Sequence, residues 1–215
     1  RRMNEMKGLS VSDRYIIKYD QSKAQVSDKN LLTRSELEML IKNGGDITKA
    51  RLVRLARSTD PGDRQYAAEL LLHSIADENS SYLIELLNDS DPNVRKTAIK
   101  TSVKKSSPEV IRALIDNLGN PEYSNQAADA LVLIGGKTLN ILDAAFYRTG
   151  QSAQVLGQIV RSIGHIGGQH AKEILWNKID FPDKVVVSKV LLALGDAGFK
   201  ANNTQGPRIR YAIET

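Results

Sequence analysis

Four lysines are the residues whose type and spacing most directly suggest a binding chemistry. Lys96, Lys100 and Lys104 stand four residues apart, and Lys105 adjoins the last of them. On a helix this spacing lines up three ammonium groups on one face. Such a row can bind an acidic protein surface or a phosphate group, although a solvated helix face has the same composition. Spacing alone favours the solvated face, and the four lysines are the candidate partner-binding residues.

Catalytic and metal-binding chemistry finds little support elsewhere in the sequence. His165 and His170 flank a Gly-Gly pair, but no third ligand stands at the spacing that a metal site needs. The glycines from Gly164 to Gly168 are not followed by the Gly-Lys-Ser/Thr of a phosphate-binding loop. The chain has no cysteine, which excludes disulfides, thiolate catalysis and cysteine-bound zinc. The sequence therefore predicts a protein without catalytic residues, metal or cofactor.

The elements that must position these residues follow from an internal repeat. Three similar phrases close with Gly135, Gly167 and Gly198, which stand 32 and 31 residues apart. A fixed period of this length is typical of a solenoid. Turn dipeptides recur at nearly the same step: Asp60-Pro61, Asp91-Pro92, Asn120-Pro121, Thr149-Gly150 and Phe181-Pro182. In the fourth repeat the two sets of marks disagree by one or two residues, so the period does not decide whether Gly157 lies at a helix contact.

Each repeat is predicted to be a pair of helices joined at one of these turns. Asp or Asn before Pro caps the second helix, Pro occupies its first position, and Gly closes it in the left-handed conformation. Small residues such as Ala98 mark the places where helices approach closely. The predicted pairs are 47–58 with 61–76, 80–88 with 92–105, 108–118 with 121–134, 137–148 with 151–166, and 169–180 with 183–195.

The flanking segments are assigned from composition. Residues 1–30 carry seven Lys and Arg against four Asp and Glu, and we expect a polar, basic linker or arm. Capping residues and a closing glycine pair predict a helix over 33–43, within a capping segment 31–45. The repeat array is expected over 46–201, and residues 202–215 are expected to begin a further, truncated segment. Because the chain begins without Met, we expect it to be part of a longer protein.

The repeats resemble a known family. The segment Asp91-Pro92-Asn93-Val94-Arg95-Lys96-Thr97-Ala98 resembles the Asp-Pro-x-Val-Arg-x-x-Ala core of HEAT repeats. The phrases that end in Gly135 and Gly167 are similar to the helix ends of short HEAT-like repeats. The resemblance covers about residues 47–200. It implies an all-α, right-handed α-solenoid of about five helix–turn–helix units.

The resemblance also implies a role for two Asp–Arg pairs that recur in successive units. It implies a structural ladder in which Asp60 and Asp91 cap helices while Arg64 and Arg95 bridge to neighbouring units. Binding of anions by the two arginines is the alternative. We favour the ladder, because residues that recur with the structural period of a repeat array usually serve its stacking.

The family includes scaffolds, adaptors, regulatory subunits and a few nucleic-acid enzymes, so the resemblance does not choose among functions. We expect a non-catalytic, cytoplasmic scaffold domain that binds a protein partner, with an acidic surface as one candidate. Repeat stacks usually bind macromolecules along an extended surface. Residues 31–215 carry 23 basic against 21 acidic residues, a balance that disfavours nucleic acid as the partner.

Two alternatives come from other classes. The first is a cytoplasmic regulatory domain of a membrane transporter, anchored through its N-terminal side. An Arg-Arg start before a polar linker is typical of the cytoplasmic edge of a membrane helix, and bacterial ATP/ADP-translocase-like carriers are similar in having HEAT repeats after the membrane part. The second is a HEAT-like nucleic-acid binder or DNA glycosylase. Such glycosylases use Trp and Asp on their concave face, but we expect Trp176 to pack in the core.

Overall fold

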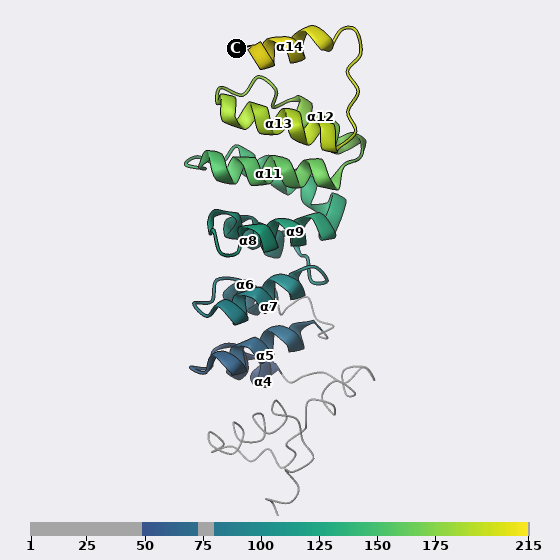
Figure 1. The fold of residues 1–215 in the computed structure, drawn as a ribbon. Coiled ribbons are helices and arrows are strands. Elements are labelled where there is room, and N and C mark those ends of the chain that lie inside the picture. Colours follow the sequence, from purple (N-terminus) through teal and green to yellow (C-terminus); the bar gives the residue numbers. More distant parts are fainter. Residues whose placement is uncertain (1–48, 73–79, 215) are drawn as a thin grey trace, which may run out of the picture.

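The computed structural model describes residues 49–72 and 80–214, and these residues form an elongated stack of helix pairs (Figure 1). The pairs are α4 (Lys49–Ala56) with α5 (Pro61–Leu71), α6 (Ser80–Leu87) with α7 (Pro92–Ser102), α8 (Pro108–Asp116) with α9 (Ser124–Ile134), α10 (Leu139–Phe146) with α11 (Ala153–Ile166), and α12 (Gly168–Trp176) with α13 (Lys184–Asp196). A last helix, α14 (Gly206–Glu214), lies at the end of the stack (Figure 1). The predicted all-α solenoid of helix pairs is confirmed, and no strand occurs among the described residues. The predicted arm over 1–30 and helix over 33–43 lie outside them.

The stack has two layers. The second helices of the pairs contact one another in the order α5, α7, α9, α11 and α13, and the first helices do so in the order α4, α6, α8, α10 and α12. Leu, Ile, Val and Ala side chains fill the space between the layers; Ala67, Ala98 and Ala127 of the second helices are fully buried. Because each pair buries its apolar face against its neighbours, the core runs along the whole stack. Within the described part of the chain, no helix is long and apolar enough to cross a bilayer.

Side-chain caps explain where most second helices begin. The Asp60 carboxylate accepts from the amide of Gly62, and Asp91 and Asp183 do the same for the amides that follow them. Ser152 caps α11 in the same way after the turn at Gly150. These contacts satisfy amides that would otherwise lack a partner at the helix start.

The turn at Asn120-Pro121 differs from this pattern. The sequence predicts that Asn120 caps a helix beginning at residue 121, but the Asn120 carboxamide accepts from the amide of Glu122 in a turn, and α9 begins at Ser124. The extra turn places the side chain of Tyr123 in the core, where it is buried. Burial of this ring, which the dipeptide does not reveal, accounts for the later start of the helix.

Candidate binding surface

The solvent-facing side chains of the second helices form one continuous surface, which we call the second-helix face. Its members include Lys96 and Lys100 of α7, Asn125 and Asp129 of α9, Gln158 and Arg161 of α11, and Lys189 and Leu192 of α13. They lie on one side because they recur at three- or four-residue spacing along neighbouring helices that contact one another. Any partner that lies along the stack on this side meets residues from several repeats at once.

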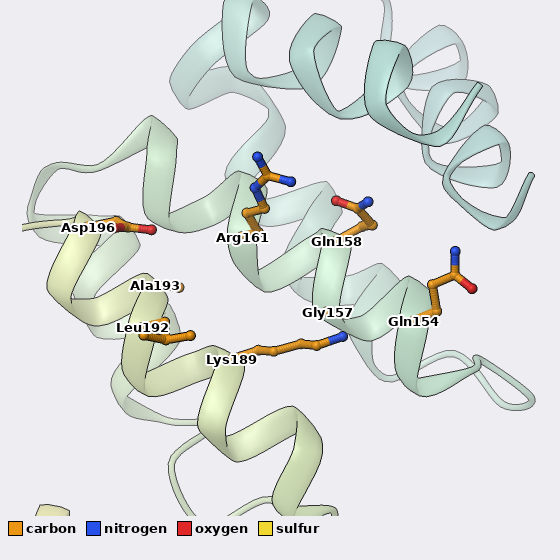
Figure 2. A pocket seen from close by; sticks show the side chains of 8 residues that line it. All are labelled: Gln154, Gly157, Gln158, Arg161, Lys189, Leu192, Ala193 and Asp196. Carbon is orange, nitrogen blue, oxygen red and sulfur yellow. The ribbon is translucent and has the colours of Figure 1, made fainter. Parts of the chain in front are cut away.

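Hollows interrupt this face, and Arg161 lines two of them. The first, of about 240 Å³, lies between α9 and α11 and includes Asp129 and His165. The second, of about 340 Å³, lies between α11 and α13 (Figure 2). We call it the α11–α13 hollow; its lining residues are Gln154, Gly157, Gln158, Arg161, Lys189, Leu192, Ala193 and Asp196.

The α11–α13 hollow exists because small residues line it. Gly157 has no side chain, and an ideal Cβ there would lie 2.5 Å from both Cδ and Nζ of Lys189. The Lys189 side chain therefore lies across Gly157, reaching from α13 towards α11 (Figure 2). Deeper in the contact, the two helices approach so closely that a Cβ on Gly164 would lie 2.7 Å from the carbonyl oxygen of Ala193.

Some polar groups around the two hollows have a hydrogen-bond or ion-pair partner, and others have none among the described residues. His165 Nε2 lies 3.6 Å from the Asp196 carboxylate, and the amide nitrogen of Gln158 donates weakly to Asn125 at 3.4 Å. Among the described residues, neither Arg161 nor Lys189 has an ion-pair or hydrogen-bond partner. The side-chain carbonyl oxygen of Gln158 is buried and accepts no hydrogen bond from them.

The four predicted lysines separate into two groups in the structure. The Lys96 ammonium lies 3.5 Å from the carboxylate of Glu122, in the turn between α8 and α9 of the next unit. Lys100 and Lys104 are exposed, and neither has an ion-pair or hydrogen-bond partner within the described ranges. Lys105 is half-buried. Helix α7 ends at Ser102, so Lys104 and Lys105 lie in a turn whose amides still donate to the carbonyl of Thr101.

Asp89 is the centre of the contacts made by the two predicted Asp–Arg pairs. Arg64 donates from Nε and Nη2 to both carboxylate oxygens of Asp89 in the next unit, at 2.6 and 2.8 Å. Arg95 donates to the Asp89 carbonyl and lies 4.7 Å from the ring centroid of Tyr123 in the third unit. Asp89 itself accepts from the amide of Asp91. Both arginines therefore join successive units.

The surroundings of Asp89 change its acidity. Burial raises the pKa of the carboxyl group. The hydrogen bonds from Arg64 and from the Asp91 amide, with the charges of Arg64 and Arg95, outweigh burial and hold the pKa of Asp89 below its ordinary value. Sequence reasoning missed this residue. Its signal was position: Asp89 stands two residues before the cap Asp91, as Ser58 stands before Asp60, and each side-chain oxygen accepts from the amide of the capping residue that follows it.

Lys178 is a buried cation that the sequence did not single out. Its ammonium pairs with the Asp143 carboxylate and lies 4.6 Å from the ring centroids of both Phe146 and Tyr147. The side chain is 0% exposed, and these contacts surround its ammonium group in place of water. They join α10 to the segment after α12. These contacts therefore connect the fourth unit to the fifth.

The histidines and the single tryptophan also make packing contacts. His170 Nε2 lies 2.7 Å from the Asn140 side-chain oxygen. Trp176 stacks on Phe199 with ring centroids 5.2 Å apart, and Arg208 lies 4.8 Å from the centroid of the Trp176 ring. No group of three or more metal-ligating side chains occurs in the part of the chain that the structure describes.

Comparison with known proteins finds a family match for part of the chain. Residues 48–135 match the sequence model of a family described as HEAT repeats. No curated protein matches the chain. Among solved structures, the chain is similar to an engineered protein with 21% identity and a TM-score of 0.40, covering 76% of this chain and 83% of the other. A second engineered protein shows 18% identity and a TM-score of 0.39, covering 94% of this chain and 62% of the other.

Proposed function

Since residues 48–135 are HEAT repeats, we propose that the chain is a non-catalytic protein-binding domain that acts as a scaffold within a larger protein. HEAT repeats commonly mediate protein interactions, and repeat stacks bind partners along an extended surface. The observation that carries the proposal is the second-helix face, which presents polar side chains of successive repeats side by side. Its hollows and unpaired cations suit a macromolecule better than a small substrate.

The lysine row on and after α7 is the part of this face that we propose binds the partner. Lys100 and Lys104 project into solvent and have no partner among the described residues, so their ammonium groups are available to a carboxylate or phosphate. Lys96 contributes less, because Glu122 already lies 3.5 Å from it. Charged groups at an interface rim mainly steer association and set specificity. Partner binding by this row should therefore weaken as salt concentration rises.

Charge reversal tests the proposal. The variant Lys96→Glu/Lys100→Glu/Lys104→Glu should lose the proteins that the parent domain captures from lysate, as identified by mass spectrometry. Its melting temperature should change by only a few degrees, because exposed substitutions usually alter stability by about 0.5 kcal/mol. The control is Arg112→Glu/Lys137→Glu/Lys172→Glu, which makes the same change in charge outside the second-helix face. Equal capture by the two variants would refute a role for the lysine row.

The described residues form no arrangement of side chains that favours either alternative, the transporter domain or the nucleic-acid binder. Trp176, which a glycosylase would use on its binding face, packs against Phe199 and Arg208 instead. A nucleic-acid binder would show steep salt dependence with oligonucleotides as well as with proteins. Oligonucleotide binding at physiological salt would therefore count for that alternative and against the scaffold.

A further inference from the structure

The α11–α13 hollow lies apart from the lysine row and has a chemistry of its own. Arg161 and Lys189 contribute two cationic groups from opposite helices (Figure 2). Neither forms an ion pair with another described residue, and the lining holds one carboxylate, Asp196, against these two cations. The net charge of the lining is therefore positive. A carboxylate is the complementary group, and the planar Arg161 guanidinium can bind one through two hydrogen bonds.

The absence of a side chain at Gly157 gives Lys189 its place in the hollow. An ideal Cβ on Gly157 would lie 2.5 Å from both Cδ and Nζ of Lys189, so the lysine occupies space that any other residue would fill. The residue is only partly exposed. Its ammonium group therefore reaches from α13 to the surface of α11 (Figure 2).

Leu192 adds an apolar contact. Its side chain is 71% exposed and lines the same hollow as Lys189. Burying an exposed leucine against another apolar side chain is favourable. We propose that the α11–α13 hollow binds a peptide segment of the partner protein in which an Asp or Glu stands close to a large apolar residue. The carboxylate pairs with the cations that line the hollow, and the apolar side chain covers Leu192. This inference rests on the proposed function and names the kind of segment that the domain recognises.

A peptide array tests this inference directly. The intact chain is incubated with immobilised short peptides that combine Asp or Glu with Leu or Phe, alongside matched peptides carrying Gln for the acid or Ser for the apolar residue. We expect retention of peptides with both groups and loss of binding with either replacement. Affinity for the best soluble peptide is then measured by fluorescence polarisation. Arg161→Gln and Lys189→Gln should each weaken it roughly tenfold, the effect of one lost charge-assisted hydrogen bond.

The matched control is Lys184→Gln/Lys200→Gln, which removes two exposed lysines of the same region that lie outside the hollow. It should bind the peptide as the parent does. Any one of three results would overturn the inference. No peptide binds, or acidic and Gln peptides bind equally, or Arg161→Gln and Lys189→Gln keep the affinity of the parent. Equal competition by a single-stranded oligonucleotide, regardless of peptide sequence, would instead identify a general polyanion site and overturn it too. Partner capture that depends on the lysine row would survive all of these outcomes, so the two proposals fail separately.

Discussion

Replacing Gly164 by alanine tests how closely α11 and α13 approach each other. An ideal Cβ on Gly164 would lie 2.7 Å from the carbonyl oxygen of Ala193, 2.8 Å from its Cβ and 2.9 Å from its Cα. Two of these atoms belong to the backbone and the third is fixed to it, so no side-chain rotation can relieve the contact. The two helices must separate, and the packing of both repeats must adjust with them.

The expected magnitude follows from two opposing effects. Alanine is favoured over glycine in a helix by about 1 kcal/mol. Overpacking a well-packed contact costs about 1–3 kcal/mol. The net result for Gly164→Ala is therefore a loss of up to about 2 kcal/mol in the free energy of unfolding, or a melting temperature lower by about 2–4 °C per kcal/mol.

Two other glycines of the same helices provide matched controls. A Cβ on Gly195 meets nothing within 4 Å, so Gly195→Ala should gain stability from helix propensity alone. A Cβ on Gly157 meets only the flexible end of Lys189, which can move away, so Gly157→Ala should cost little. Thermal and urea unfolding, followed by far-ultraviolet circular dichroism, should rank the three variants in the order Gly195→Ala, Gly157→Ala, Gly164→Ala from most to least stable. A Gly164→Ala variant as stable as Gly195→Ala would refute the close approach of the two backbones.

Two further predictions concern the core and the contact at Asp89. Ala98→Asp should lower the free energy of unfolding by several kcal/mol, because Ala98 is fully buried and the introduced carboxylate would have no partner. Deletion of 202–215 should cost far less, and unfolding curves measure both changes. An Ala98→Asp variant that melts like the parent would contradict the assignment of α7 to the core. Asp89→Asn should destabilise the chain at neutral pH. Because the folded-state pKa of Asp89 is depressed, its contribution is present above about pH 4 and is lost as the pH falls through that lower pKa. The difference between parent and variant in urea midpoint should therefore shrink on acidification, and a difference independent of pH would contradict the ion pair with Arg64.

The repeat predicted the helix pairs because its signals are local. A capping side chain and the proline after it act within one turn, so Asp60 and Asp91 mark the starts of α5 and α7 correctly. Asn120-Pro121 carries the same signal and fails, because the position of Tyr123 in the core decides where α9 begins. Burial of a side chain against another repeat is a property of the fold, and a dipeptide does not encode it.

The repeat left open the place of Gly157, and the structure places it at the contact of α11 with α13. Gly157 and Gly164 both face α13, one under the side chain of Lys189 and the other against the backbone of Ala193. The two glycines differ in what they contact, and only the arrangement of α13 distinguishes a contact with a flexible chain from one with backbone.

The candidate site was harder to foresee than the fold. The lysine row could be read from sequence because its members are four residues apart on one helix. Arg161 and Lys189 stand on different helices, 28 residues apart, and each is a single charged residue flanked by one Ser and one Val. Asp89 and Arg64 are likewise distant in sequence. Only the stacking of the repeats brings such residues together.

The charges of the second-helix face also bear on the kind of partner. Lys100 on α7 and the cations of the α11–α13 hollow are separated by α9, whose exposed Asp129 carries the opposite charge. A nucleic acid presents phosphates at close, regular intervals, and a protein that tracks it needs an unbroken basic surface. On this face, phosphates opposite α9 would meet a carboxylate. A polypeptide can instead place acidic residues opposite the two cationic regions and a neutral or basic residue opposite Asp129. We therefore expect this discontinuous pattern to bind a protein with spaced acidic segments more tightly than a uniform polyanion.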